Sequence, residues 1–384
     1  MRIKSEPQSL HIINSAIIMK LLFSIKTIKK SKGGSERVIS QIVSGLVNKH
    51  DITVLTFDKA YGDIAYPINS AVHKVFLGIG DAGKKATLIE SIRRIIALRE
   101  FIRSEHPDMV IAFQHSMFVP MSIALIGLNI PLISSEHIVP HHYRRKPFEY
   151  LLMVLAGLLS YRITVLSEKI KMMYPLMLRS RMVAVANPVY IPETTHDDIH
   201  KSSDEGVILN IGRLDPQKDQ KILIRAFAVL AGKYPGWKLR IIGSGILREQ
   251  LERLADDTGF NERISFPGTI DDINQEYLRS DIFAMSSRYE SFGLGTAEAM
   301  AHGLPVVGFA DCPGTNELII HNENGFLVEG RERHVAMAFA IEKLIMSAEL
   351  RKSMGERGKV MVAQFSLDNI LDKWEEIIKT VAKR

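Results

Sequence analysis

Short apolar runs alternate with helical patterns along most of this chain of 384 residues. Such alternation is typical of parallel sheets built from strand–helix–strand units. Residues 35–48 show the helical pattern most clearly, because their apolar side chains recur every three or four positions and so share one stripe. The runs that we predict as strands are residues 20–25, 52–57, 109–113, 132–135 and 162–166 in the first half, and 207–211, 238–242, 264–266, 282–285, 305–308 and 325–328 in the second.

The two halves are separated by a polar, proline-bearing stretch at residues 187–206, which is typical of a linker. We therefore expect an α/β fold with two Rossmann-like, doubly wound domains facing a central cleft. In such sheets ligands bind at the carboxyl ends of the strands. The first domain is expected over residues 1–186, with 1–18 as an extension before Met19, our expected natural start. The second is expected over residues 187–364.

Composition indicates an ordinary soluble protein, with 46% hydrophobic and 24% charged residues. The single cysteine, Cys312, excludes an internal disulfide and has no neighbouring histidine that would activate it. The apolar run at residues 151–159 is about half the ~20 residues needed to span a bilayer. The N-terminus lacks the ordered regions of a signal peptide.

Positive charge is concentrated in the first half. Residues 1–186 contain 25 Lys and Arg against 13 Asp and Glu, whereas residues 187–384 contain 24 against 30. No aromatic side chains are interleaved with the basic groups in the manner of an RNA-binding sheet, so we expect no nucleic-acid partner. An anionic membrane surface is the better prediction, through Arg93, Arg94, Arg144, Arg145 and Lys146. Solvated basic faces are the alternative.

A glycine pair, Gly33 and Gly34, follows the first predicted strand and precedes a helix. Glycines there let the backbone approach a ligand closely, and a helix N-terminus offers free N–H groups to an anion. The spacing is not G-x-G-x-x-G, so it gives no support to a nicotinamide cofactor. A simple tight connection is the alternative.

Two cations, Arg213 and Lys218, follow a buried strand in the stretch "NIGRLDPQKDQ". Paired positive charges beside a helix start are suited to a diphosphate. In isolation they are equally consistent with ordinary surface charge.

Two carboxylates, Glu290 and Glu298, flank a turn that contains Gly293 and Gly295. A carboxylate offers paired acceptors to vicinal hydroxyls, such as those of a ribose or a second sugar. A metal site is the weaker interpretation, because the chain has no Asp-x-Asp and the nearest histidine, His302, lies four residues beyond Glu298. Purely structural glutamates are the remaining alternative.

Together these motifs resemble family 4 of the retaining glycosyltransferases, which have the GT-B fold, and in particular its bacterial surface-polysaccharide members. The matching stretches are the glycine pair before "SERV", "GRLDPQK", "IIGSG" at 241–245, "FPGTI" at 266–270, and the E-x7-E pair followed by "GLPVV". The resemblance runs from about Met19 to the C-terminal helix. It implies that a helix at residues 365–384 packs back on the first domain.

The resemblance also implies roles for individual residues. Arg213 and Lys218 would hold the nucleotide diphosphate, Glu298 the ribose hydroxyls and Glu290 the donor sugar. His137, in "SSEH", would face that sugar. The remaining donor-site positions are backbone groups of Gly33, Gly34, Phe292, Gly293 and Leu294, with the base against Gly243 and Thr269.

The implied activity is transfer of a hexosyl or N-acetylhexosaminyl unit from a nucleotide sugar, UDP-linked by expectation, to a lipid-linked saccharide. We expect no metal or other cofactor, and a location in the cytoplasm at the inner face of the membrane. Whether Glu290 forms a covalent intermediate, or the acceptor attacks from the leaving group's side, stays open. Rival interpretations are a non-hydrolysing UDP-sugar 2-epimerase, a non-catalytic nucleotide-sugar-binding protein and a nucleic-acid-binding protein.

Overall fold

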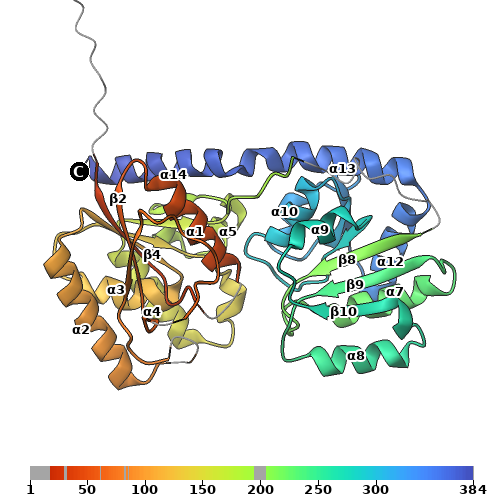
Figure 1. The fold of residues 1–384 in the computed structure, drawn as a ribbon, viewed down its shortest axis with the longest axis horizontal. Coiled ribbons are helices and arrows are strands. Elements are labelled where there is room, and N and C mark those ends of the chain that lie inside the picture. Colours follow the sequence, from red (N-terminus) through yellow and green to blue (C-terminus); the bar gives the residue numbers. More distant parts are fainter. Residues whose placement is uncertain are drawn as a thin grey trace, which may run out of the picture.

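The computed structural model describes residues 18–29, 33–60, 62–81, 84, 86–193 and 205–383. These form two α/β halves, each built on an all-parallel sheet, joined by the linker and by the C-terminal helices (Figure 1). The predicted extension lies outside the described residues except for Ile18, and so do residues 194–204 of the predicted linker.

The N-terminal sheet has, within the described residues, seven strands in the order β3-β2-β1-β4-β5-β6-β7. Its strands are β1 (Lys20–Ser24), β2 (Asp51–Thr56), β3 (His73–Phe76), β4 (Met109–Phe113), β5 (Leu132–Ser135), β6 (Arg162–Val165) and β7 (Met182–Ala184). Its helices are α1 (Gly34–Leu46), α2 (Leu88–Glu105), α3 (His115–Ala124), the 3-10 turn η1 (Pro140–Tyr143), α4 (Pro147–Leu159), α5 (Glu168–Met172) and α6 (Leu176–Arg179).

The C-terminal sheet has six strands within the described residues, in the order β10-β9-β8-β11-β12-β13. Its strands are β8 (Gly206–Ile211), β9 (Trp237–Ile242), β10 (Ile264–Gly268), β11 (Ile282–Ala284), β12 (Val306–Phe309) and β13 (Gly325–Val328). The helices are α7 (Gln220–Ala231), α8 (Arg248–Asp257), α9 (Ile273–Leu278), α10 (Leu294–Ala301), α11 (Thr315–Leu318), α12 (Arg333–Ile345), α13 (Ala348–Val362) and α14 (Leu367–Ala382).

Helices cover both faces of each sheet. In the N-terminal half, α1 and α14 pack on one face, in a core that includes Phe23, Phe113 and Trp374. Helices α2 to α6 cover the other face. Helices α13 and α14 run along one edge of both halves, and α14 lies over the N-terminal half (Figure 1). Helix α14 therefore connects the two halves, because it follows α13 of the C-terminal half in sequence and buries its apolar side in the N-terminal core.

The predicted strands all occur, and the α/β fold with two doubly wound domains is confirmed. Two strands, β3 and β7, were not predicted; both are edge strands of four or fewer residues without a long apolar run. One predicted membrane contact is wrong. Arg94 is buried, because its guanidinium donates to the Ile79 carbonyl at 2.9 Å and lies over the Phe57 ring.

Candidate active site

The predicted site residues come after the carboxyl ends of strands. Gly33 follows β1, His137 follows β5, Arg213 follows β8 and Glu290 follows β11. In the N-terminal sheet β1 and β4 are neighbours, and the strands that follow each of them in sequence extend toward opposite edges of the sheet. The same holds for β8 and β11 in the C-terminal sheet. These are the switch points at which doubly wound sheets bind ligands.

Lys218 and Glu290 form the central charged pair of the C-terminal half. The Lys218 Nζ lies 2.6 Å from Glu290 Oε1, and both side chains are largely buried. Ser287 Oγ donates to the same oxygen at 2.5 Å. Ser287 was not predicted, since its only signal in the sequence is its place three residues before Glu290. One carboxylate oxygen thus accepts two hydrogen bonds, which fixes its direction.

The loop that carries Lys218 is bound to the loop that carries Glu290. Arg288 N–H donates to the Gln217 carbonyl at 2.9 Å, and Gln217 Nε2 donates to the Tyr289 carbonyl at 3.0 Å. Ser286 Oγ donates to the Lys218 carbonyl at 2.8 Å. Because these bonds involve the backbone of both loops, the charged pair is positioned before any ligand arrives.

Glu298 lies in α10, about one turn after its start, and is buried. Tyr277 O–H donates to Glu298 Oε2 at 3.0 Å, and burial raises the pKa of Tyr277. The other oxygen, Oε1, forms an ion pair with Arg37 of α1, in the opposite half. Neither partner was predicted, because Tyr277 is distant from Glu298 in sequence and the Arg37 contact depends on how the two halves are placed.

Arg213 lies in the same loop as Lys218 but takes no part in the ion pair between Lys218 and Glu290. Its side chain is 71% exposed and its Nη2 lies 3.1 Å from Asp215 Oδ2. The backbone around it is fixed, because Gln220 Nε2 donates to the Arg213 carbonyl at 2.9 Å. An exposed guanidinium on a fixed loop is free to turn toward an anion.

Two glycines of the site have backbone that other residues avoid. Gly293 has φ 83° and is the residue just before α10. Gly243 has φ 135°, and a Cβ there would lie 2.1 Å from the Gly212 carbonyl oxygen. Thr269, the other residue predicted near the base, is exposed, with its hydroxyl 3.4 Å from Ser244 Oγ.

Gly33 and Gly34 act differently from those glycines. Gly33 is the residue before α1 and has φ −87°, which any residue adopts. A Cβ on Gly34 would lie 3.8 Å from Leu294 Cδ2, at the start of α10. The pair therefore brings two helix N-termini, α1 and α10, close together from opposite halves.

His137 is buried after β5, with its ring stacked on Phe113 at 5.1 Å between centroids. Burial lowers the pKa of His137 to about 4, so the ring is neutral. Thr164 O–H donates to Ser135 Oγ at 2.8 Å, and Ser135 Oγ lies 3.0 Å from His137 Nε2. Nδ1 is buried without a hydrogen-bond partner among the described residues.

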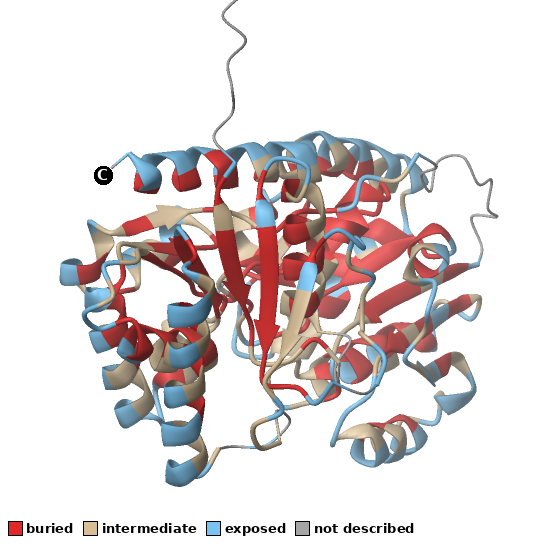
Figure 2. Cartoon of the chain, turned by 60° about the vertical axis from the view of Figure 1, so that its left-hand side comes forward, coloured by how far each residue is buried: buried red, intermediate tan, exposed pale blue. Residues whose placement is uncertain are grey.

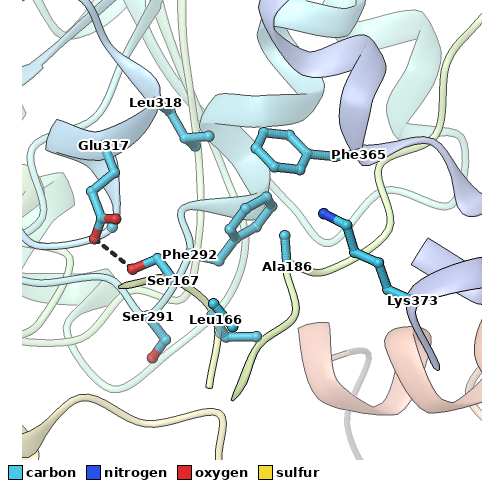
Figure 3. Close-up of a pocket in the computed structure, with 11 residues that line it drawn as sticks. Leu166, Ser167, Ala186, Ser291, Phe292, Glu317, Leu318, Phe365 and Lys373 are labelled. Atoms are coloured by element: carbon cyan, nitrogen blue, oxygen red, sulfur yellow. Dashed lines mark hydrogen bonds between the residues drawn. The ribbon is translucent and has the colours of Figure 1, made fainter. Parts of the chain in front are cut away.

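Further contacts join the two halves beside the site. The His141 ring stacks on Tyr289 at 6.4 Å between centroids, and Ser167 Oγ donates to Glu317 Oε1 at 2.8 Å. The second contact borders a pocket of about 180 Å³ (Figure 3), whose lining is Leu166, Ser167, Ala184, Ala186, Ser291, Phe292, Gly314, Glu317, Leu318, Phe365 and Lys373. Phe292 packs edge-on against Phe365 at 5.3 Å, so its side chain belongs to this pocket. The volume is below the ~300 Å³ typical of ligand sites.

Over the described ranges, no group of three or more His, Cys, Asp and Glu side chains is placed to hold a metal ion. Metal independence remains a prediction. The helices of the described part include none whose length and apolarity would let it cross a membrane.

Comparison with known proteins identifies the chain's family. Residues 32–189 match the model described as Glycosyltransferase Family 4, and residues 192–361 match Glycosyl transferases group 1. The chain belongs to the family 4 glycosyltransferases. The glycosyltransferase is 27% identical over 354 residues to an uncharacterized glycosyltransferase of Haemophilus influenzae, covering 91% of this chain and 97% of the relative.

A second relative has a more specific name. It is the GalNAc-α-(1→4)-GalNAc-α-(1→3)-diNAcBac-PP-undecaprenol α-1,4-N-acetyl-D-galactosaminyltransferase of Campylobacter jejuni. The glycosyltransferase is 25% identical to it over 369 residues, which cover 95% of this chain and 99% of the relative.

Solved structures confirm the GT-B fold of the glycosyltransferase. Sucrose-phosphate synthase from Thermosynechococcus elongatus superposes with a TM-score of 0.81 at 18% identity, covering 94% of this chain and 98% of the other. Anabaena HepE in complex with UDP and glucose superposes with a TM-score of 0.75 at 21% identity, covering 94% and 99%. At these identities the likeness shows the fold alone.

Proposed function

We propose that this glycosyltransferase moves a hexosyl or N-acetylhexosaminyl unit from a UDP-sugar to a lipid-linked saccharide, with retention, during surface-polysaccharide or lipopolysaccharide assembly. The observation that carries the proposal is the buried Lys218–Glu290 pair beside Glu298, at the switch point of the C-terminal sheet. The UDP complex of HepE and the undecaprenyl-linked acceptor in the Campylobacter relative's name support the choice of donor and acceptor.

Charge grows on the leaving diphosphate as the bond between sugar and phosphate breaks. Lys218 is held in place for this charge, and Arg213 is free to turn toward it. The N-termini of α1 and α10 add backbone N–H groups from two sides. Preorganised donors of this kind contribute on the order of 3 kcal/mol each to transition-state stabilisation.

Glu290 binds the donor sugar rather than attacking it. Its Oε1 already accepts from Lys218 and Ser287, and these bonds stabilise the carboxylate's charge and lower its reactivity. The acceptor hydroxyl would then attack from the face that the diphosphate leaves, and a phosphate oxygen would take the proton. Closure of the two halves would exclude water, which competes as an acceptor.

His137 donates a hydrogen bond to a hydroxyl of the donor sugar. Because Thr164 donates to Ser135, the Ser135 hydroxyl hydrogen is free to reach His137 Nε2. The proton of the neutral ring then sits on Nδ1, the buried atom for which the described part of the chain offers no partner. A buried donor left unpaired is unfavourable by about 1–3 kcal/mol, so a ligand hydroxyl there contributes to binding.

A lipid-linked acceptor requires the enzyme to work at the cytoplasmic face of a membrane. The exposed basic residues Arg93, Arg144, Arg145 and Lys146 supply attraction to an anionic leaflet. Nucleic acid is not a partner in this proposal, and neither a metal nor another cofactor takes part in the reaction.

The test is a thermal-shift comparison of UDP-, GDP- and ADP-sugars, since a ligand that binds the folded state raises its melting point. A shift with UDP-sugars alone supports the donor, and UDP release that depends on added lipid-linked saccharide supports the transfer. Conversion of the UDP-sugar without acceptor would identify an epimerase instead. Binding without any turnover would identify a non-catalytic protein.

A further inference from the structure

One layer of the N-terminal half has apolar side chains on both its inner and its outer side. Helices α2 to α6 form this layer on one face of the sheet. Its inner side is ordinary core, with residues such as Leu98, Met121 and Met153 fully buried. A helix layer on a soluble protein normally presents polar residues on the opposite side.

The outer side of this layer is apolar instead. In the described part of the chain, 23 large hydrophobic side chains are exposed, and fourteen of them lie on these helices or at their ends. They are Leu88, Ile89, Ile92, Ile96, Ile123, Ile126, Phe148, Leu151, Leu155, Leu158, Leu159, Met172, Leu176 and Met177. The view in Figure 2 brings the N-terminal half forward and shows the exposed outer turns of its helices.

Helix α4 shows the pattern most clearly. Phe148, Leu151, Leu155 and Leu158 are spaced at three or four residues, so they form one exposed stripe, and Phe148 is 69% exposed. The opposite stripe, with Met153 and Ala156, is buried. Both sides of α4 are thus apolar, although only one contacts the protein.

The C-terminal half provides an internal comparison. Its sheet is covered by helices of the same kind, yet its exposed large hydrophobics are scattered singly, as Val229 on α7, Phe339 on α12 and Val360 on α13. Single exposed hydrophobics are normal, whereas a broad apolar surface marks an interaction site. Only the layer α2 to α6 shows such a surface among the described helices.

Charge indicates the partner. Residues 88–179, which contain the layer, hold 11 Lys and Arg against 7 Asp and Glu. Exposed Arg93 and Arg103 lie on α2, and Arg144, Arg145 and Lys146 precede α4. An apolar face fringed by cations matches a bilayer with anionic headgroups, since acyl chains accept Leu, Ile and Phe without matched pockets.

The layer leads directly to the cleft. Helix α4 begins just after the turn η1, which contains His141, and His141 stacks on Tyr289 next to Glu290. We propose that the outer face of α2, α3, α4 and α6 inserts into the headgroup region of an anionic bilayer, so that a membrane-held acceptor meets the cleft beside η1. The encounter with a membrane-held acceptor rests on the proposed function, whereas the insertion of this face into the bilayer does not.

The test uses the full chain with phosphatidylglycerol and phosphatidylcholine vesicles. The variant Phe148→Ser/Leu151→Ser/Leu155→Ser should lose roughly tenfold or more of its binding to phosphatidylglycerol vesicles, at low and high salt alike. The charge variant Arg144→Gln/Arg145→Gln/Lys146→Gln should bind more weakly than the wild type at low salt only. At high salt the two should bind alike, because salt screens the electrostatic attraction of the wild type as well. The matched control is Val229→Ser/Phe339→Ser in the C-terminal half, which should bind as wild type.

A second variant reports insertion itself. Leu155→Trp places an indole on the face, and vesicles with brominated acyl chains should quench it more than they quench wild-type fluorescence, since Trp237 and Trp374 are buried. Wild-type binding by the triple serine variant, or an unquenched Leu155→Trp, would overturn the proposal. The proposal would also be overturned if the wild type bound no vesicle but formed a dimer that the triple serine variant abolished, because the face would then be a protein–protein interface. Vesicle binding through this face without donor binding would leave the insertion standing and refute the proposed function.

Discussion

Arg37 of α1 and Glu298 of α10 form an ion pair that crosses from one half of the enzyme to the other. Tyr277 donates to the second oxygen, so each oxygen of the Glu298 carboxylate has one protein partner. A ribose hydroxyl that approaches Oε1 therefore competes with Arg37 for this oxygen. The pair joins the two halves, and a ligand that binds Glu298 would weaken this contact between them.

The first prediction concerns Glu298→Ala. Loss of a charged acceptor for ribose hydroxyls should weaken UDP-sugar binding by roughly 1.5–3 kcal/mol. Calorimetry on the folded variant measures this, and Glu249→Ala, an exposed glutamate of α8, is the control that should bind as wild type. Unchanged affinity of Glu298→Ala would remove the residue from the donor site.

Arg37→Met should have the opposite effect on the nucleotide alone. The substitution keeps an apolar side chain against α10 but removes the cation that competes with the ribose. UDP affinity should rise by about fivefold, corresponding to about 1 kcal/mol for a pair that no longer has to be broken. Weaker UDP binding in calorimetry would show that Arg37 binds the nucleotide rather than competing with it.

Lys218→Ala should lower turnover more than it lowers donor affinity. In the proposed mechanism Lys218 meets the charge that develops on the leaving diphosphate, so kcat should fall by roughly 10²-fold or more. Initial rates of UDP release measure the effect. Lys221→Ala, which changes a half-buried lysine in the first turn of α7, should leave kcat unchanged. Normal turnover in Lys218→Ala would show that the Lys218–Glu290 pair is structural.

Activity should persist in EDTA. The described residues provide no cluster of metal ligands, and in the proposed mechanism cations of the protein meet the charge on the diphosphate. UDP release is measured before and after dialysis against chelator. Loss of activity that Mg²⁺ or Mn²⁺ restores would contradict the prediction.

The fold and the charged motifs could be predicted because each depends on local sequence. Buried parallel strands are continuous apolar runs, and Glu290, Glu298 and Lys218 stand beside glycine turns and helix starts. Contacts between segments that are far apart in the sequence could not be predicted. Arg37 is the third residue of the helix predicted at residues 35–48, and nothing local indicates that it contacts residue 298.

The same limit applies to burial. Arg93 and Arg94 are adjacent and equally basic, yet Arg94 is buried over Phe57 whereas Arg93 is exposed. A helix turns by about 100° per residue, so neighbours in sequence point in different directions. The apolar outer stripe of α4 was likewise visible as a hydrophobic run, but which side faces the sheet required the structure.

The last prediction concerns Glu136, the neighbour of His137. Burial raises the pKa of Glu136 to about 8, although Tyr143 O–H and Ile138 N–H donate to its two oxygens at 3.0 and 2.9 Å. In the unfolded chain a glutamate ionises near its ordinary pKa of about 4.3. Between these values the folded state holds a proton that the unfolded state has lost, so stability falls as pH rises from about 5 to about 8.

The contribution of Glu136 is thus fully present below its unfolded pKa and is lost as pH passes through the folded value. Glu136→Gln cannot ionise, and its amide oxygen can still accept from Ile138. In the wild type, ionisation of Glu136 should lower the free energy of unfolding by up to about 1.4 kcal/mol for each pH unit of increase. The variant should lack this pH dependence. Urea unfolding at several pH values across this window measures the slope. His137, with a pKa lowered to about 4, titrates in the opposite sense and only on the acid side, so it does not mask the effect near pH 7 to 8. Equal slopes in wild type and variant over that upper range would show that Glu136 is ionised in the folded enzyme.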